Sequence, residues 1–186
     1  MPETQYDFDL VKEFIAGYES AFNKLIRKYQ QKIYWHARRM TGNHLDADEI
    51  VQEVLMTLYN KLHTFEFKSS LYTWIFRITS TRSLNFLKKR SLRKIFSFTE
   101  NDFDITLKQS EGDLINEFEQ KEMIEKVNRY LQKLPARQRE VFVFRNFDEL
   151  SYEEISKITG KSVGGLKSNY FHAINKMAEM MKNETE

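Results

Sequence analysis

The sequence predicts an all-α protein, with two small helical domains joined by an acidic flexible linker and a helix-turn-helix in the C-terminal domain. Gly occurs 6 times and Pro 2 times in 186 residues, so few positions interrupt a helix. Apolar residues recur at helical spacing along most of the chain. The hydrophobic fraction of 41% argues against wholesale disorder, and the length suits one large domain or two small ones.

Two helices are expected at the start of the first domain, which we place at residues 1–91. A long helical stretch over residues 10–41 ends at Gly42, a residue typical of helix ends. The second helix opens at residues 46–49, because their sequence Asp-Ala-Asp-Glu has the spacing of a capping box. An apolar stripe at helical spacing then continues this helix.

A third helix and the linker follow. The helix covers residues 71–90 and is capped by Ser69 or Ser70. Residues 92–113 show no sustained period, so we expect them to form the linker. About twenty residues span roughly 65–70 Å when fully extended, and such a linker can join two sites that lie far apart.

The second domain is expected at residues 114–186. A helix over residues 114–134 is broken by Pro135, which suits the first turn of the next helix. A capping box at residues 151–154 opens a short helix that ends at a glycine, and a last helix covers residues 163–181. The short helix, the turn and the last helix have the order of a helix-turn-helix.

The last helix has two distinct faces on a wheel of about 100° per residue. A buried stripe is expected at Leu166, Tyr170, Ala173 and Met177. The opposite side carries Gly164, Ser168, His172 and Asn175, with Phe171 beside them and Lys167 at the border. Polar side chains of this kind can bond to base edges in a major groove, and a Phe can contact a thymine methyl. A helical hairpin that packs without DNA is the alternative.

Basic and acidic residues occupy separate blocks, although the net charge is only +2. Residues 21–45 contain six Lys or Arg and no acid, and residues 67–99 contain eight and no acid. Residues 100–125 have the opposite charge, since they contain nine acids and only two lysines. This pattern indicates two surfaces that face polyanions, separated by a self-repelling connector. Ordinary solvated helix faces are the alternative.

Five aromatic residues cluster within twelve positions at the start of the second basic block: Phe65, Phe67, Tyr72, Trp74 and Phe76. We expect the rings of Phe65 and Phe67 to lie in a loop outside the core. Rings interleaved with cations suit single-stranded DNA, because bases stack on them at roughly 1–3 kcal/mol each while cations bind phosphates. Such a loop can also hold an extruded base. An aromatic-rich core is the alternative.

The helix that opens at residue 46 combines acids with apolar residues on the side away from its apolar stripe. These residues are Asp48, Glu49, Gln52, Glu53, Met56 and Tyr59. Exposed Met and Tyr among acids are typical of a protein interface, and the acids suit a basic partner surface. A plain solvated face is the alternative.

The composition also argues against several functions. The chain has no Cys, which excludes disulfides, thiolate nucleophiles and Cys-based zinc sites and fits the cytoplasm. The first ten residues contain three acids and no apolar run, so we expect no signal peptide. The sequence has no stretch of about 18 apolar residues, so we expect no membrane span. The four His have no metal spacing or nucleophile partner, and no phosphate-binding loop motif occurs. We therefore expect no catalysis, cofactor, metal or small-molecule substrate.

Four segments resemble, in the same order, the motifs of the extracytoplasmic-function (ECF) sigma factors within the bacterial sigma-70 family. They are DADEIVQEV at 46–54, SLYTWIFRI at 70–78, LPARQREVF at 134–142, and LSYEEI with SVGGLKS at 150–168. The first is similar to the helix that docks on the polymerase clamp, and the second to the segment that opens and reads the −10 element. The third is similar to the opening of the second domain, and the fourth to its −35-reading motif.

The resemblance, which covers nearly the whole chain, implies a function in transcription initiation. Such a protein binds core RNA polymerase, positions it at a promoter and helps to melt the −10 region through binding energy. The implied partners are the clamp of the largest polymerase subunit, the polymerase flap, promoter DNA and an anti-sigma factor. The acidic linker is expected to follow the polymerase's RNA path, where its charge mimics nucleic acid.

The resemblance also implies three sets of site residues. The polymerase-binding set is Asp48, Glu49, Gln52, Glu53 and Met56. The set for −10 DNA is Phe65, Phe67, Lys68, Tyr72, Trp74, Arg77, Thr81 and Lys88. The set for −35 DNA is Gly164, Lys167, Ser168, Phe171, His172, Asn175 and Arg137.

The chain departs from the family's pattern at a few positions. Gly165 stands where Thr is common, and Asn169 and His172 stand where Arg is usual. Two glycines at the start of the last helix permit close backbone approach, and a helical Gly costs roughly 1 kcal/mol relative to Ala. Thr81 stands where some members have Asn. The departures in the last helix affect which −35 sequence is read, and Thr81 affects which base of the −10 element is captured.

Two other functions are compatible with individual segments. A stand-alone helix-turn-helix regulator would bind duplex DNA without polymerase, but it leaves the acidic helix and the aromatic loop unexplained. An all-helical interaction protein would bind no DNA at all.

Overall fold

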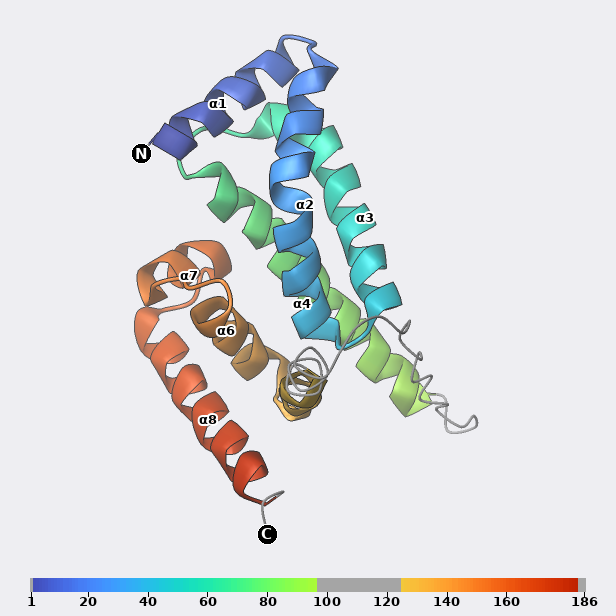
Figure 1. Cartoon of the computed structure of the whole chain (residues 1–186), viewed down its shortest axis with the longest axis vertical. Helices are drawn as coiled ribbons and strands as arrows, with labels where there is room; N and C mark the ends of the chain where they lie inside the picture. Colours follow the sequence, from blue (N-terminus) through green and yellow to red (C-terminus); the bar gives the residue numbers. More distant parts are fainter. Residues whose placement is uncertain (1, 97–124, 184–186) are drawn as a thin grey trace, which may run out of the picture.

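The computed structural model describes residues 2–96 and 125–183, and every regular element in those two ranges is a helix (Figure 1). We refer to the two ranges as the N-terminal half and the C-terminal half. None of the helices in these ranges is both long and apolar enough to cross a membrane.

The N-terminal half is a helical bundle. Its elements are α1 (Pro2–Ile15), α2 (Glu19–Thr41), α3 (His44–Lys61), the short 3-10 helix η1 (Leu62–Thr64) and α4 (Leu71–Phe96). Helices α2, α3 and α4 pack along one another, and α1 crosses one end of the bundle (Figure 1). Their shared core includes Ile33, Ile50, Val54, Leu58 and Ile75, all nearly inaccessible to solvent.

The predicted single helix over residues 10–41 is wrong, because the chain turns between α1 and α2. Gly17 adopts a φ of 99°, a conformation that L side chains rarely adopt, and its N–H bonds to the Phe14 carbonyl. The predicted end at Gly42 is confirmed, since this residue caps α2 with a φ of 77°. The break lets α1 fold back over the bundle.

The predicted capping box at residues 46–49 is also wrong. Helix α3 begins two residues earlier, and the Asn43 side chain accepts the N–H of Asp46 at 3.2 Å. The Asp46 carboxylate pairs instead with Arg90 of α4 at 3.1 Å. Ser70 does cap α4, because its hydroxyl accepts the N–H of Thr73 at 3.1 Å.

Helix α4 continues through Phe96, beyond the expected start of the linker at residue 92. The rest of the expected linker and the first part of the helix predicted over 114–134 lie outside the described residues. The last part of that helix is present at residues 125–133.

The C-terminal half confirms the predicted helix-turn-helix. After the helix at residues 125–133 come α6 (Ala136–Asn146), α7 (Tyr152–Thr159) and α8 (Val163–Lys182). Ser151 and Glu154 form the predicted capping box, and Gly160 makes the turn with a φ of 70°. The predicted stripe on α8 faces α6, with Leu166, Ala173 and Met177 buried and Tyr170 half-buried.

The two halves pack against each other along a surface that we call the seam. Helices α6 and α7 lie beside α2 and α4 (Figure 1). One hydrophobic cluster runs through both halves, and Phe76 of α4 meets Phe144 of α6 within it. The two predicted helical units therefore exist, but in this arrangement they are in contact rather than apart.

The capping box of α7 generates the first prediction. We expect Ser151→Ala to lower the free energy of unfolding by about 1 kcal/mol at neutral pH. The Ser151 N–H and hydroxyl both donate to Glu154, at 2.8 and 2.7 Å, and these bonds lower the pKa of that carboxyl. Their stabilisation is present above the ordinary carboxyl pKa and is lost as the pH falls through the lowered pKa.

The measurement is urea unfolding followed by circular dichroism, at neutral pH and at a pH below the lowered pKa of Glu154. Ser20→Ala, at an exposed serine in the first turn of α2, is the control. The assignment fails if the two variants are equally stable at neutral pH, or if the Ser151→Ala effect is as large in acid.

Candidate nucleic-acid and partner interfaces

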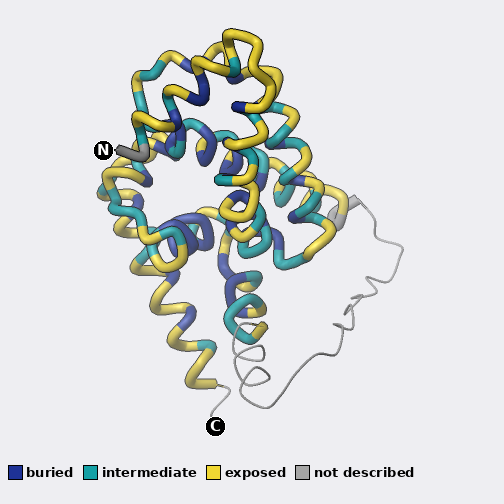
Figure 2. Tube along the Cα trace, turned by 45° about the horizontal axis from the view of Figure 1, so that its top comes forward, coloured by how far each residue is buried: buried dark blue, intermediate teal, exposed yellow. Residues whose placement is uncertain are grey.

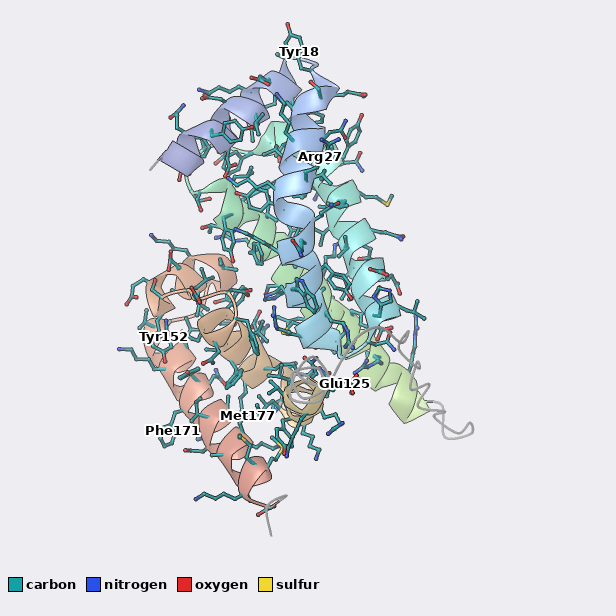
Figure 3. The ribbon with its side chains drawn as sticks, in the orientation of Figure 1. Tyr18, Arg27, Glu125, Tyr152, Phe171 and Met177 are labelled. Carbon is teal, nitrogen blue, oxygen red and sulfur yellow. The ribbon has the colours of Figure 1, made fainter. Side chains whose placement is uncertain are left out.

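The outer face of α8 is open to solvent. Gly164, Lys167, Ser168, Phe171, His172 and Asn175 are all exposed, as predicted, and the Phe171 side chain has a relative accessibility of 62%. Figure 3 shows Phe171 pointing away from α6 and Met177 pointing toward it. In Figure 2 the tube of α8, which leads to the C-terminus, is exposed at most positions, with buried positions at intervals.

The start of α8 is also accessible. The Ser162 hydroxyl accepts the N–H of Gly165 at 3.2 Å and caps the helix. A Cβ built on Gly164 would meet no atom within 4 Å, so the backbone there has open space around it. An anion can therefore approach the positive end of this helix.

Three polar residues of α6 and α8 make contacts within the chain. The Asn169 amide donates to the Gly165 carbonyl at 3.0 Å, which keeps it along the helix. Arg137, placed by the resemblance in the −35 set, is exposed on α6 and pairs with Glu140 at 3.2 Å. Lys167 lies with its ammonium 5.7 Å from the Tyr152 ring, so it packs toward α7 while remaining exposed.

The predicted partner face of α3 is largely exposed. Glu49 and Gln52 are exposed, Asp48 and Glu53 are half-buried, and Met56 has a relative accessibility of 66%. An exposed Met of this size is unusual on an otherwise solvated helix and fits a binding surface.

Side chains of this face contact both neighbouring helices, α4 and α2. Glu53 pairs with Arg82 of α4 at 3.2 Å, and the same guanidinium donates to Thr57. The Tyr59 hydroxyl donates to Glu19 of α2 at 3.1 Å, and this bond raises the pKa of the tyrosine. The acidic face is therefore anchored to the helices on both sides of it.

The aromatic loop between η1 and α4 is partly buried. The Phe65 side chain is buried and packs against Trp74, with ring centroids 5.6 Å apart. Phe67 is half-buried with a φ of 58°, and its ring meets Phe8 of α1 edge-on at 5.2 Å. The expectation that both loop rings lie outside the core is wrong for Phe65, because Phe8 of α1 covers the loop.

The remaining residues of the −10 set lie along the loop and α4, and most are accessible. Lys68, Thr81 and Lys88 are exposed, and Lys68 pairs with Glu66 at 2.7 Å. Tyr72 stacks on Phe76, with centroids 4.1 Å apart, and burial raises the pKa of its phenol. Tyr72 therefore remains a neutral hydrogen-bonding group at physiological pH.

Arg77 of the same set contacts the other half of the chain. Its guanidinium donates to the carbonyls of Lys157 at 2.6 Å and Ile158 at 3.4 Å, at the C-terminal end of α7. One turn further along α4, the buried Ser80 hydroxyl donates to the buried Glu140 carboxylate of α6.

Other buried polar groups cross the seam, and reading the sequence did not single them out. His36 Nδ1 lies 2.8 Å from an Asp148 carboxylate oxygen, and the His36 ring packs on Phe144 at 4.5 Å. The Arg139 guanidinium donates to the Met40 carbonyl, and burial together with the charge of Arg90 lowers the Arg139 pKa to about 10. Arg139 therefore stays charged at neutral pH.

Comparisons with known proteins agree with this architecture. Residues 25–93 match the family model "Sigma-70 region 2", and residues 124–177 match "Sigma-70, region 4". The RNA polymerase sigma-H factor of Pseudomonas aeruginosa is 30% identical over 180 residues, which cover 91% of this chain and 90% of the relative. The ECF RNA polymerase sigma-E factor of Escherichia coli (strain K12) is 30% identical over 182 residues, 93% of each chain.

Two solved structures share the fold. RpoE of Bartonella quintana, in complex with the anti-sigma factor NepR, has a TM-score of 0.69 at 23% identity over 87% of this chain and 96% of its own. CnrH, in complex with the cytosolic domain of CnrY, has a TM-score of 0.69 at 20% identity over 96% of this chain and 98% of its own. With both family regions present in order and the relatives covered almost end to end, this chain belongs to the ECF group of the sigma-70 family.

Proposed function

We infer that this protein binds core RNA polymerase and directs it to promoters by reading −35 and −10 elements and helping to melt the −10 region. The observation that carries this function is the presence of both sigma-70 regions, in order, in a chain that covers its sigma-factor relatives almost completely. The outer face of α8 is exposed at the positions predicted to contact DNA, as this function requires.

We propose that α8 enters the major groove at the −35 element. Lys167, Ser168, His172 and Asn175 then lie at base edges or phosphates, and Phe171 lies at a thymine methyl. The accessible start of the helix at Gly164 admits a phosphate. Arg137 of α6 adds a cation to this set.

We propose that α4 and the loop before it receive the −10 element. Phe67, Tyr72 and Trp74 provide rings for unpaired bases, and Lys68, Arg77 and Lys88 provide cations for the backbone, with Thr81 beside the bases. The buried Phe65 acts indirectly, since its ring supports Trp74 and Phe67 from inside the bundle.

We propose that the α3 face docks on the polymerase clamp through Asp48, Glu49, Gln52, Glu53 and Met56. The flap would bind the C-terminal half. An anti-sigma factor is the expected regulator, in keeping with the anti-sigma complex described for the Bartonella quintana protein.

The proposed division of the chain follows the two matched regions. Residues 1–91 form the polymerase- and −10-binding domain, residues 92–113 form the connector, and residues 114–186 form the −35-binding domain, with α4 extending into the connector. We propose that the protein acts in the cytoplasm, where it meets polymerase, and that it opens DNA through binding energy without catalysis of its own.

A footprint tests this function. We expect core polymerase with this chain to protect both elements of a promoter, while the chain alone binds weakly. The reason is that each half offers only a small DNA surface, and polymerase holds the two together. Equal footprints with and without polymerase would favour a stand-alone regulator.

The α3 face has its own test. We expect Gln52→Ala/Glu53→Ala to reduce the affinity for core polymerase by about tenfold or more, because interface energy concentrates in a few central residues. Pull-down and fluorescence titration with core polymerase measure it. The control is Gln30→Ala/Glu13→Ala, an exposed Gln and Glu on α2 and α1. A double variant that binds polymerase as well as the control would remove the clamp assignment.

The α8 face is tested by promoter selection. We expect Lys167→Ala and His172→Ala to change the preferred −35 sequence, with a loss of about 1–3 kcal/mol for each base pair that is no longer read, and to leave the −10 preference as it was. Sequencing of randomised promoters selected by holoenzyme measures both preferences. Lys176→Ala, at an exposed lysine on another side of α8, should change neither. An unaltered −35 preference in both variants contradicts the assignment.

A further inference from the structure

Two lysines from the first helices lie over aromatic rings of the proposed −10 surface. Lys12 of α1 has its ammonium 5.9 Å from the centroid of the Phe67 ring. Lys32 of α2 has its ammonium 6.0 Å from the centroid of the Tyr72 ring. Both lysines are exposed, and neither belongs to the −10 set that the resemblance implies. Only the packing of α1 and α2 brings these cations to the loop and to α4.

A buried carboxylate fixes α1 on α2 and so determines where the lysines lie. Asp7 of α1 accepts the Tyr29 hydroxyl at 2.5 Å and the Lys28 ammonium at 2.7 Å, both from α2. Helix α1 also contacts η1 and α4, which places it beside the aromatic loop (Figure 1). Lys28 is thus engaged within the fold. Lys12 and Lys32 form no ion pair with any residue that the structure describes, and both can bind a phosphate.

The Tyr72 ring has both of its faces covered. Phe76 stacks on one face, with ring centroids 4.1 Å apart and planes 15° from parallel. The Lys32 ammonium must lie over the other face, because the stacked ring fills the first. An unpaired base can therefore stack on Tyr72 only when this ammonium moves aside. A cation–π contact at an exposed site is weak, so a DNA strand that offers a phosphate can draw the ammonium away.

The Phe67 ring is arranged in a similar way. Phe8 of α1 meets it edge-on at 5.2 Å, and Phe65 packs against it at 5.0 Å. The Lys12 ammonium lies over the ring on the solvent side of the loop, where its own side chain is exposed. Rings for bases and cations for phosphates, set side by side, are the combination that binds single-stranded DNA.

We propose that Lys12 and Lys32 are phosphate-binding residues of the −10 site. In the free chain each ammonium rests on an aromatic ring, and it moves onto a phosphate when an unpaired base stacks on that ring. This proposal rests on the proposed function and extends the −10 surface from the loop and α4 onto α1 and α2. It also accounts for Lys32 as a member of the first basic block of the sequence.

The salt dependence of DNA binding tests the proposal. Each cation that contacts a phosphate of a single strand steepens the log–log slope of affinity against salt concentration by about 0.7. We expect Lys12→Ala/Lys32→Ala to make this slope shallower by about 1.4. The measurement is fluorescence anisotropy of a single-stranded −10 oligonucleotide, titrated at several salt concentrations with holoenzyme assembled from core polymerase and this chain.

Two further variants separate a role in DNA binding from a structural role. Lys12→Arg/Lys32→Arg should keep the original slope, because Arg also binds phosphates and stacks on rings. Lys161→Ala/Lys176→Ala removes two exposed lysines from the C-terminal half and is the charge-matched control. If holoenzyme binds the oligonucleotide no better than core polymerase alone, the proposed function itself is wrong. If holoenzyme binds it and Lys12→Ala/Lys32→Ala has the slope of the control, the assignment of the two lysines is overturned.

The exchange between ring and phosphate has a signature of its own. Phe67→Leu removes a stacking surface but no charge. We expect it to weaken oligonucleotide binding by roughly fivefold or more and to leave the salt slope unchanged, because Lys12 still reaches its phosphate. A slope that becomes shallower in Phe67→Leu would mean that Lys12 needs the ring while DNA is bound, which contradicts the exchange.

Discussion

Hydrogen bonds to the last carbonyls of two helices, together with apolar contacts such as Phe76 with Phe144, join the two halves of the structure. The last four carbonyls of a helix have no partner within it and must find donors elsewhere. At the end of α2, the Gly42 N–H donates to the Arg38 carbonyl and the Gln132 amide donates to the Arg39 carbonyl. The Arg139 guanidinium donates to the Met40 carbonyl, and the Arg90 guanidinium donates to the Thr41 carbonyl. At the end of α7, the Gly160 N–H donates to the Ser156 carbonyl. The Arg77 guanidinium of α4 donates to the carbonyls of Lys157 and Ile158.

Each half therefore supplies hydrogen-bond donors to the last carbonyls of a helix in the other half. A hydrogen bond contributes only about 0.5–1.5 kcal/mol net, because water replaces the lost partner when the bond opens. Separating the halves would also expose the apolar side chains that the two halves bury against each other, so these bonds are one part of what holds the seam.

Local sequence patterns predicted most of the helices and the exposed outer face of α8, because the periods and caps involved lie within a few residues of one another, but they missed the turn at Gly17 and the start of α3. The capping box at Ser151 and the stripe from Leu166 to Met177 are examples. The same patterns missed the burial of Phe65, which depends on Phe8 more than fifty residues earlier. No local pattern indicated the contact between His36 and Asp148, because these residues are 112 positions apart. The roles of the α3, α4 and α8 faces stay predictions until they are measured.

The contacts across the seam differ from those within the N-terminal bundle, and this difference indicates which parts of the protein should move relative to each other. Within the N-terminal half, α3 and α4 share an apolar core and are bridged at the surface by Glu53 with Arg82 and by Asp46 with Arg90. Exposed ion pairs of this kind add little individually, so apolar burial keeps these two helices together. The seam also buries apolar side chains, such as Phe76 against Phe144, but it adds polar pairs such as His36 with Asp148 whose partners water can replace. Movement should therefore occur between the halves, so that α3 and α4 move together while α8 is carried away from them.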